Sequence, residues 1–312
     1  MPDIIVIGSG VSGLSCARCL QLAGYSVHIV TESLPLHTTS VAAGAAWSGS
    51  GIAGRGRTWA AATLDYFLKL TDEPNSGVTL QRMREVYAQR VADPWYRDLL
   101  PFFQRLSKHE LRHGMTDGYL MDVPMVAPPI YLDRLHSQFL ATGGRIETKT
   151  VDSLLELTAK AQLLINCSGV GARDLANDAG VYPIRGQTAL LDAKGIRVGY
   201  MDNEAVHHIF PRADGVLIGG VKDEGNWNQD LEPGLLAKMI ERCSRIESRL
   251  AQAKVLREFV GLRPGRADVR LEVETLSDGG AVIHNYGHGA VGYTLSWGCA
   301  QEVTKLAQSL LN

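Results

Sequence analysis

The apolar residues at the start of the chain fall into two short runs separated by a stretch with helical spacing. Ile4 to Ile7 is a β-branched run of the kind that forms a buried parallel strand. Leu14 to Leu22 has the periodicity of a helix that Gly24 ends, and Ser26 to Val30 predicts a second strand. This order of strand, helix and strand predicts a nucleotide-binding unit.

Three glycines, Gly8, Gly10 and Gly13, connect the first strand to the helix in the pattern G-x-G-x-x-G. In such a turn the glycines allow a tight bend, let the backbone approach a pyrophosphate and let the helix pack on the strand. The phosphates then bind at the helix N-terminus. Glu32 follows the second strand, where an acidic residue accepts hydrogen bonds from the adenosine ribose. A chance glycine-rich turn is the alternative, but the order of the elements favours a dinucleotide site, with NAD and FAD both open.

Beyond Glu32 the pattern predicts an excursion from the nucleotide-binding sheet, between Trp47 and Pro129. Residues 33–51 are rich in small side chains, which suit a close approach of the backbone to a ligand; a flexible linker is the alternative. The elements expected up to residue 166 are helices at 58–70, 80–100 and 130–142, and strands at 119–126, 145–151 and 161–166.

The pattern changes to alternating strands between Tyr182 and Phe259. An antiparallel sheet is predicted there. After it, residues 260–312 contain a second glycine-rich turn before a final helix from Leu295, which indicates a second part of the same ligand site. The strands expected in the sheet are 187–191, 196–200, 208–211 and 216–219, followed by a helix at 235–250.

The composition is that of an ordinary globular protein of 312 residues, long enough for two domains. The net charge of −2 argues against a nucleic-acid or anionic-membrane surface. No run of about 18 apolar residues predicts a membrane span, and the first strand leaves no room for a signal peptide, so a cytoplasmic location is expected. The five cysteines indicate reduced thiols, and we expect Cys16 and Cys19 to pack the first helix, with a redox pair as the alternative.

Four blocks distributed over the chain resemble the D-amino-acid oxidase and D-aspartate oxidase family. They are HTTSVAAG at 37–44, INCSGVGA at 165–172, GLRPGRADVRLE at 261–272 and HNYGHGAVGYTLSWGCA at 284–300. The blocks stand in the family's order, the resemblance covers essentially the whole chain, and HNYGHG followed by SWGCA is specific.

The resemblance implies an α/β fold. A Rossmann-like FAD-binding domain of the glutathione-reductase type is expected at 1–48, 130–180 and 260–312. An interleaved α+β substrate domain with an antiparallel sheet is expected at 49–129 and 181–259. The distant blocks favour FAD over NAD, because together they form a cradle for the isoalloxazine ring; FAD is expected to bind without a covalent link.

The activity implied by the resemblance is oxidative deamination of a D-amino acid. Hydride passes from the substrate α-carbon to flavin N5, water hydrolyses the imino acid to a 2-oxo acid and ammonia, and oxygen is reduced to hydrogen peroxide. No side chain is an obligatory acid or base, so positioning and exclusion of water carry most of the rate. The implied partners are a small D-amino acid and O2, and a homodimer is left open.

Arg263 is the residue that the resemblance assigns to the substrate carboxylate. A guanidinium offers a planar fork that a carboxylate meets in two parallel hydrogen bonds. A surface or interface salt bridge is the alternative for Arg263, and Arg266 and Arg270 are expected to be structural or flavin-facing. The cofactor contacts implied by the motifs are Gly8, Ser9, Gly10, Val11, Ser12, Gly13, Glu32, Ser33, Thr38, Thr39, Ala43, Gly44, Val151, Ser168, Arg263, Gly289, Ala290, Gly292, Tyr293 and Thr294.

The sequence departs from the family at His208, where the family has a tyrosine that binds the substrate carboxylate. Imidazole can still donate a hydrogen bond but can titrate near neutrality. The loss of the tyrosine is therefore expected to affect binding more than chemistry. A metal pair with His207 is disfavoured, because adjacent strand residues point to opposite faces, and no metal site is predicted.

Four further positions are expected to shape the substrate pocket. A second family tyrosine falls at Glu204, in a lid of about residues 194–206 that is shorter than in the family. Ser48 and Ser50 replace a glutamine and a tyrosine, which predicts a wider and wetter pocket. Ala290 replaces a glycine whose carbonyl binds the substrate amine, and this backbone contact can survive the extra methyl group.

Three other functions are kept as alternatives to the D-amino-acid oxidase. A D-aspartate oxidase needs a second cation in the pocket, which Arg197 or His207 supplies only if the lid folds inward, whereas Glu204 would attract a basic substrate. A flavin-binding protein without turnover is suggested by His208, but Arg263 stands in its full motif. A dehydrogenase that uses an acceptor other than oxygen is the third.

Overall fold

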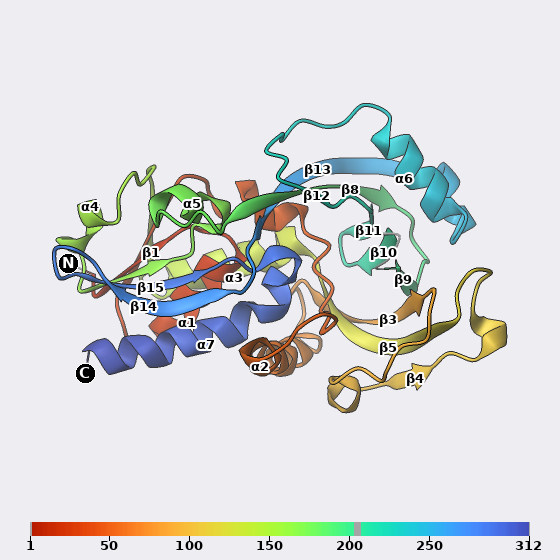
Figure 1. Cartoon of the computed structure of the whole chain (residues 1–312), viewed down its shortest axis with the longest axis horizontal. Helices are drawn as coiled ribbons and strands as arrows, with labels where there is room; N and C mark the ends of the chain where they lie inside the picture. The colour runs from red at the N-terminus through yellow and green to blue at the C-terminus, as the bar shows by residue number, and fades with distance from the viewer. Residues whose placement is uncertain (1, 203–206, 312) are drawn as a thin grey trace.

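The computed structural model describes residues 2–202 and 207–311, and its strands form two sheets that lie side by side (Figure 1). The six-stranded sheet has the order β14-β15-β7-β1-β2-β6. Its neighbours pair in parallel except for β14, which runs antiparallel to β15. Its strands are β1 (Ile4–Ile7), β2 (Val27–Thr31), β6 (Arg145–Thr148), β7 (Leu163–Asn166), β14 (Arg270–Thr275) and β15 (Ala281–Tyr286).

Helices and loops bury both faces of the six-stranded sheet, which is why β1 is apolar throughout and β7 is apolar up to Asn166. Ile4 and Val6 face one layer of helices, whereas Ile5 and Ile7 face a smaller cluster on the other side. The first layer contains α1 (Val11–Leu22), α3 (Pro128–Ala141) and the long α7 (Gly292–Leu311), and the other side contains α4 (Leu155–Thr158); α5 (Ala172–Leu175) follows β7 in the chain (Figure 1).

The nine-stranded sheet has the order β12-β8-β11-β10-β9-β3-β5-β4, and β13 pairs with β8. Its pairs are antiparallel except for the parallel pair of β3 with β9. Its strands are β3 (Val78–Tyr87), β4 (Phe103–Arg105), β5 (Asp117–Val126), β8 (Tyr182–Asp192), β9 (Val198–Asp202), β10 (His207–Arg212), β11 (Gly215–Gly219), β12 (Asp223–Glu224) and β13 (Lys254–Gly265).

The two faces of this second sheet have different neighbours. The outer face packs against α6 (Leu235–Ser244), which buries Leu191, Ile209 and Ile218 in one apolar cluster. Because side chains alternate along a strand, His208 and Phe210 lie on the inner face. Phe210 belongs to the same core cluster as the first sheet, so the inner face looks toward the nucleotide-binding unit.

Helix α2 (Arg55–Leu70) joins the excursion to the last helix. The hydroxyl of Thr63 accepts a hydrogen bond from the amide of Gly298 at 2.9 Å. Tyr66 stacks on Trp297 with ring centroids 3.6 Å apart. A side chain at Gly298 would collide with the backbone of Trp59, so the glycine is what lets these two helices approach so closely.

Most elements predicted from the pattern are confirmed, and the α/β fold with a largely antiparallel second sheet is confirmed. The helix predicted at 80–100 is wrong, because residues 78–87 form β3, which pairs with β5 on one side and β9 on the other. Pairing with strands distant in sequence outweighed the helical spacing. The helix predicted at 235–250 is too long: α6 ends at Ser244, and Ser248–Gln252 is a separate 3₁₀ turn.

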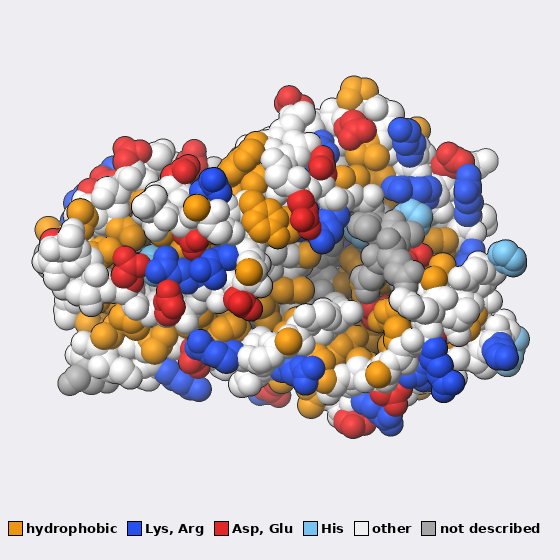
Figure 2. Space-filling model, viewed as in Figure 1, with side chains coloured by type: hydrophobic (Ala, Val, Ile, Leu, Met, Phe, Trp, Pro, Cys, Tyr) orange, Lys and Arg blue, Asp and Glu red, His pale blue; other side chains and the backbone are white. Residues whose placement is uncertain are grey.

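The expected domain boundaries can be compared with the strands that make up the two sheets. Segments 49–129 and 181–259 contain every strand of the nine-stranded sheet in full except β13. The boundary between residues 259 and 260 falls inside β13, which continues to Gly265. In the part of the chain that the structure describes, no helix is long and apolar enough to span a membrane. Basic and acidic side chains are interspersed on the face shown in Figure 2, which is hollowed near its centre.

Candidate active site

A cavity of about 470 Å³ lies between the nucleotide-binding sheet and the inner face of the second sheet. It reaches from the loops after β1 and β2 to the strand β13 and the N-terminus of α7. All predicted cofactor contacts except Gly13 line it: Gly8, Ser9, Gly10, Val11, Ser12, Glu32, Ser33, Thr38, Thr39, Ala43, Gly44, Val151, Ser168, Arg263, Gly289, Ala290, Gly292, Tyr293 and Thr294.

Steric constraints require glycine at two positions of the turn. Gly8 has a φ of +99°, and a Cβ there would lie 2.6 Å from the carbonyl oxygen of Cys167. Gly13 lies beneath the cavity wall, where a Cβ would collide with the carbonyl oxygen of Gly8. The two glycines therefore let α1 begin directly behind β1, with its N-terminal residues Val11 and Ser12 at the cavity.

Arg263 lies on the inner face of β13 and lines the cavity. Its Nη1 donates to the carbonyls of Val221 at 3.2 Å and Arg185 at 3.4 Å. Among the described residues no carboxylate forms an ion pair with it, and burial lowers the pKa of its guanidinium below the usual arginine value. A side chain at Gly186, on the neighbouring strand, would collide with the guanidinium, so Gly186 makes the space that Arg263 fills. The arrangement leaves a half-buried cation for an anionic ligand.

His208 lies on the same inner face but does not line the cavity. Its ring stacks on Phe210 at 4.6 Å and fills the space over Gly219, where a side chain would collide with it. The Nε2 atom is buried without a hydrogen-bond partner in the described chain. Burial first, and then the charge of Arg263, lower the pKa of His208 to about 3, so the imidazole is neutral.

The remaining predicted substrate contacts are more scattered. Ser48 and Ser50 do not line the cavity: the amide of Ser48 donates to Thr294 Oγ1 at 3.2 Å, and that of Ser50 donates to Ser48 Oγ at 3.3 Å. Ala290 lines the cavity. Arg197 is exposed before β9, and Glu204 lies outside the described residues.

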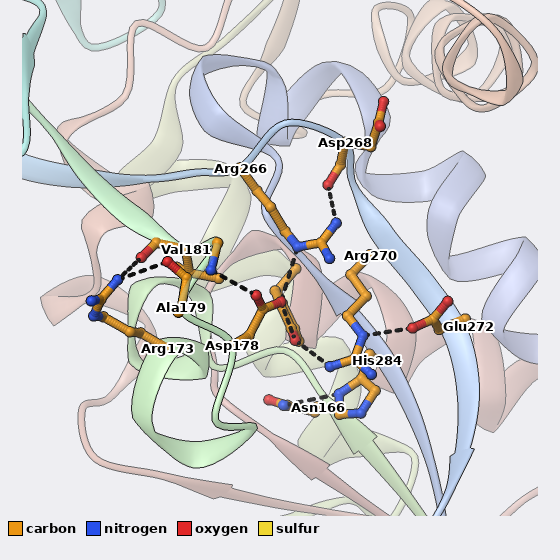
Figure 3. Close-up of polar contacts among 12 residues, drawn as sticks. Asn166, Arg173, Asp178, Ala179, Val181, Arg266, Asp268, Arg270, Glu272 and His284 are labelled. Atoms are coloured by element: carbon orange, nitrogen blue, oxygen red, sulfur yellow. Dashed lines mark hydrogen bonds and ion pairs between the residues drawn. The ribbon is translucent and has the colours of Figure 1, made fainter.

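A buried polar chain that no sequence motif predicts leads away from Ser168 through Asn166 and His284, and Figure 3 shows the last two side chains. Asn166 Oδ1 accepts from the Ser168 amide at 3.2 Å and from its hydroxyl at 2.6 Å, so its Nδ2 faces His284 Nδ1 at 3.2 Å. This fixes the histidine tautomer: Nδ1 accepts, and Nε2 donates to Glu274 at 3.1 Å. Ser168 is thereby held at the cavity wall through two fully buried side chains.

Arg266 and Arg270 belong to an ion-pair network next to Asn166 and His284 (Figure 3). Neither arginine lines the cavity. Arg266 pairs with Asp178 at 2.9 Å, and Arg270 pairs with Glu272 at 2.7 Å. The hydroxyl of Tyr286 connects the two arginines, because it accepts from Arg270 at 2.8 Å and donates to Asp178 at 2.9 Å. The structural alternative for Arg266 and Arg270 thus accounts for the contacts that they make.

His288 lines the cavity and stands inside the HNYGHG block, but the motifs predicted no role for it. Its Nε2 lies 3.1 Å from Asn285 Oδ1. Asn285 in turn donates through Nδ2 to Cys16 Sγ at 3.1 Å, so His288 is the donor in the first bond. Burial lowers the pKa of His288 to about 4, which keeps this imidazole neutral as well.

The two neutral histidines predict acid sensitivity below pH 6.5. Unfolded histidine binds a proton near pH 6.5, whereas folded His208 and His288 do so only at about 3 and about 4. Since the unfolded state then binds more protons, stability present above pH 6.5 is lost as the pH falls, by roughly 1.4 kcal/mol per pH unit for each histidine.

Urea unfolding of the purified protein at pH 7.5, 6.0 and 5.0 measures this loss, in a range above the ordinary titration of carboxylates. His288→Gln should flatten the pH dependence, because glutamine keeps a donor toward Asn285 but does not titrate. An equal slope in wild type and variant would contradict the assignment to His288.

The donors around the cavity fit a flavin adenine dinucleotide. Glycines and a helix N-terminus at Val11 suit the pyrophosphate, and Glu32 suits the ribose. The small residues Ala42 to Ala46, Gly289, Ala290 and Gly292 line the opposite end, where a flat ring needs a close approach of the backbone. Both walls needed for a dinucleotide are therefore present in one cavity.

A family model described as FAD dependent oxidoreductase matches residues 3–306. The chain belongs to this family. The D-amino-acid oxidase of Rubrobacter xylanophilus is 38% identical to this oxidoreductase, over 99% of this chain and 96% of the relative. The D-amino-acid oxidase of Streptomyces coelicolor is 35% identical over 98% of this chain and 96% of the relative.

Among solved structures, glycine oxidase from Bacillus cereus shares the fold of this oxidoreductase. The TM-score is 0.81 at 18% identity, over 99% of this chain and 95% of that chain. The resemblance predicted from the four sequence blocks is therefore confirmed, and FAD is the cofactor of the family to which the chain belongs.

Proposed function

We propose that this oxidoreductase is a D-amino-acid oxidase that converts a D-amino acid to a 2-oxo acid, ammonia and hydrogen peroxide. The observation that carries the proposal is Arg263, a half-buried guanidinium at the wall of the cavity of about 470 Å³, with no carboxylate partner among the described residues. The names of the two relatives supply the amino-acid class and its D-configuration.

Arg263 is proposed to bind the substrate carboxylate with two parallel hydrogen bonds and so to orient the α-carbon. Bound FAD would supply the hydride acceptor and the route by which the electrons reach O2. Neutral His208 lies behind Gly44, where it shapes the pocket wall instead of carrying charge. Ala290 and Glu204 remain proposed substrate contacts. Ser48 and Ser50 remain proposed as well, although neither serine lines the described cavity, and none of the four residues is required as an acid or base.

The cofactor contacts that line the cavity are proposed to hold FAD without a covalent bond. Cys167 is the cavity-lining thiol, and its hydrogen bond to Cys16, together with burial, raises its pKa far above 9.0. A protonated thiol is a poor nucleophile. His288 already donates to Asn285, and the hydroxyl of Tyr293 donates to the carbonyl of Ser40.

A neutral or basic D-amino acid fits the described cavity better than D-aspartate. An acidic side chain needs a second cation beside Arg263. Among described residues that line the cavity, Lys149 is the other lysine or arginine, and it pairs with Glu156. We also propose the two-domain division given above, a cytoplasmic location, and leave a homodimer as an assembly to test.

The test is anaerobic addition of D-alanine, D-arginine or D-aspartate to the purified yellow protein. We expect D-alanine or D-arginine to bleach the flavin absorbance, and readmitted air to restore it with release of peroxide. Glycine, sarcosine and the L-enantiomers serve as controls for other amine oxidases. A yellow protein that no D-amino acid bleaches would overturn the proposal, and bleaching without peroxide would indicate an acceptor other than O2.

A further inference from the structure

Residues 40–46, called here the cavity loop, are tied down through their main-chain carbonyls by side chains from distant segments. The hydroxyl of Tyr293 donates to the carbonyl of Ser40 at 3.1 Å. Thr188 Oγ1 donates to the carbonyl of Ala42 at 3.2 Å, and Arg212 Nη1 donates to the carbonyl of Ala43 at 3.0 Å. Three carbonyls within four residues are thus held by α7, β8 and β10.

The cavity loop contains a strained residue two positions after the last of these contacts. Ala45 has a φ of +59°, in the left-handed region that disfavours any residue with a Cβ. Ala45 is buried and lines the cavity, and its carbonyl accepts from the Val126 amide at 3.0 Å. Such a conformation persists only where its surroundings enforce it.

Arg212 is built to hold one geometry. Its side chain is fully buried, and Asp214 accepts from Nε at 2.8 Å and from Nη2 at 2.6 Å. This bidentate pair leaves Nη1 aimed at the carbonyl of Ala43. Strand alternation places Arg212 on the same inner face as Phe210, against which Gly44 packs so closely that a Cβ would lie 2.8 Å from the ring.

We propose that Arg212, oriented by Asp214, and Thr188 are positioning residues that hold the cavity loop in its strained form against the cofactor. The second sheet thereby sets the position of the wall that the small residues Ala42 to Ala46 present to the cavity. The proposal rests on FAD as the ligand of this cavity. A simpler reading is that the Arg212–Asp214 pair only stabilises the turn between β10 and β11.

The substitution Ala45→Gly distinguishes these two explanations. If the Arg212–Asp214 pair, called here the clamp, enforces the strained form, a glycine at position 45 removes part of the need for the clamp, because glycine adopts positive φ without the Cβ penalty. If the pair only stabilises the turn, Ala45→Gly cannot compensate for its loss.

The experiment measures release of FAD from diluted holoenzyme through the recovery of free-flavin fluorescence. Arg212→Met combined with Asp214→Asn removes the clamp without leaving a buried charge unpaired, and should raise the FAD dissociation constant about tenfold, the effect of one lost charge-assisted bond. Ala45→Gly alone should change it less than about twofold. Added to the clamp variant, Ala45→Gly should recover about threefold, in line with the removal of left-handed strain.

Thr188→Val is the second, milder variant, and Thr188→Ser is its matched control. Valine should weaken FAD binding about threefold through loss of one neutral hydrogen bond, whereas serine should keep it. The positioning role is overturned if the clamp variant binds FAD as wild type does. It is also overturned if the variant loses affinity together with thermal stability and Ala45→Gly restores neither. Since FAD binding is the readout, a protein that shows the rescue but oxidises no D-amino acid would overturn the proposed function alone.

Discussion

Replacing Arg263 with Met should lower kcat/KM for a D-amino acid by about 10²- to 10⁴-fold while the other cofactor contacts keep FAD bound, since removing one partner of a buried charge pair costs about 3–5 kcal/mol. Methionine fills a similar volume but offers no donor to a carboxylate. Arg263→Lys keeps the charge and loses the planar fork, so it should recover only part of the activity.

Anaerobic stopped-flow bleaching over a range of D-alanine concentrations measures the effect, with the flavin absorbance as the check on FAD content. Arg257→Met is the matched control, because Arg257 lies on the same strand but is exposed, with its guanidinium over the ring of Phe259. Both variants lose one arginine from β13. Equal activity losses in the two variants, or an unchanged rate in Arg263→Met, would contradict the assigned role.

The nucleotide-binding half could be predicted because its signals are local. Strand β1, the glycine turn and α1 follow one another within the first 22 residues, and each carries its own apolar period or glycine spacing. Strand β3 could not be predicted in the same way. Its apolar residues also fit a helix, and the pairing that decides the matter comes from β5 and β9, far along the chain. Pro94, inside the predicted helix, was the available signal against it.

The candidate site divides in a similar manner. Arg263 stands in a motif, so the sequence points to it directly. Gly186 does not, and its importance follows only from the register of β8 with β13, which brings it beneath the Arg263 guanidinium. The clamp on the cavity loop is equally hidden, because Arg212 and Ala43 are distant in sequence and the contact is to a main-chain carbonyl.

These contacts indicate which parts of the cavity each of the two sheets supplies. The first sheet supplies the helix N-terminus and glycine turn at one end, and the inner face of the second supplies Arg263 and the clamp at the other. The inner face can hold two large polar side chains because Gly186 leaves room for Arg263 and Gly219 leaves room for His208. The polar side chains of the site are therefore positioned by the space that these glycines leave as much as by hydrogen bonds.

Gly13→Ala should deprive the protein of FAD, so that it is purified colourless or fails to fold. The added Cβ collides with the carbonyl oxygen of Gly8, and both are backbone positions that can separate only if α1 moves away from β1. Overpacking of a core lowers the free energy of unfolding by about 1–3 kcal/mol even where side chains can move aside. Here the nearest atoms belong to the backbone of Gly8, so no side chain can relieve the collision. Moving α1 also moves the amides of Val11 and Ser12 at the cavity, so we expect FAD affinity to fall by at least about 100-fold, the equivalent of about 2.7 kcal/mol.

Gly171→Ala is the matched control, because Gly171 lines the same cavity but has a helical φ of −65°. A Cβ there would meet only the Cβ of Ser168, at 4.0 Å. It should leave the yellow colour and the unfolding temperature close to those of wild type. The flavin-to-protein absorbance ratio after gel filtration, together with circular dichroism, separates loss of FAD from loss of fold. A folded Gly13→Ala protein with a full complement of FAD would show that α1 does not need its close approach to Gly8 to bind the cofactor.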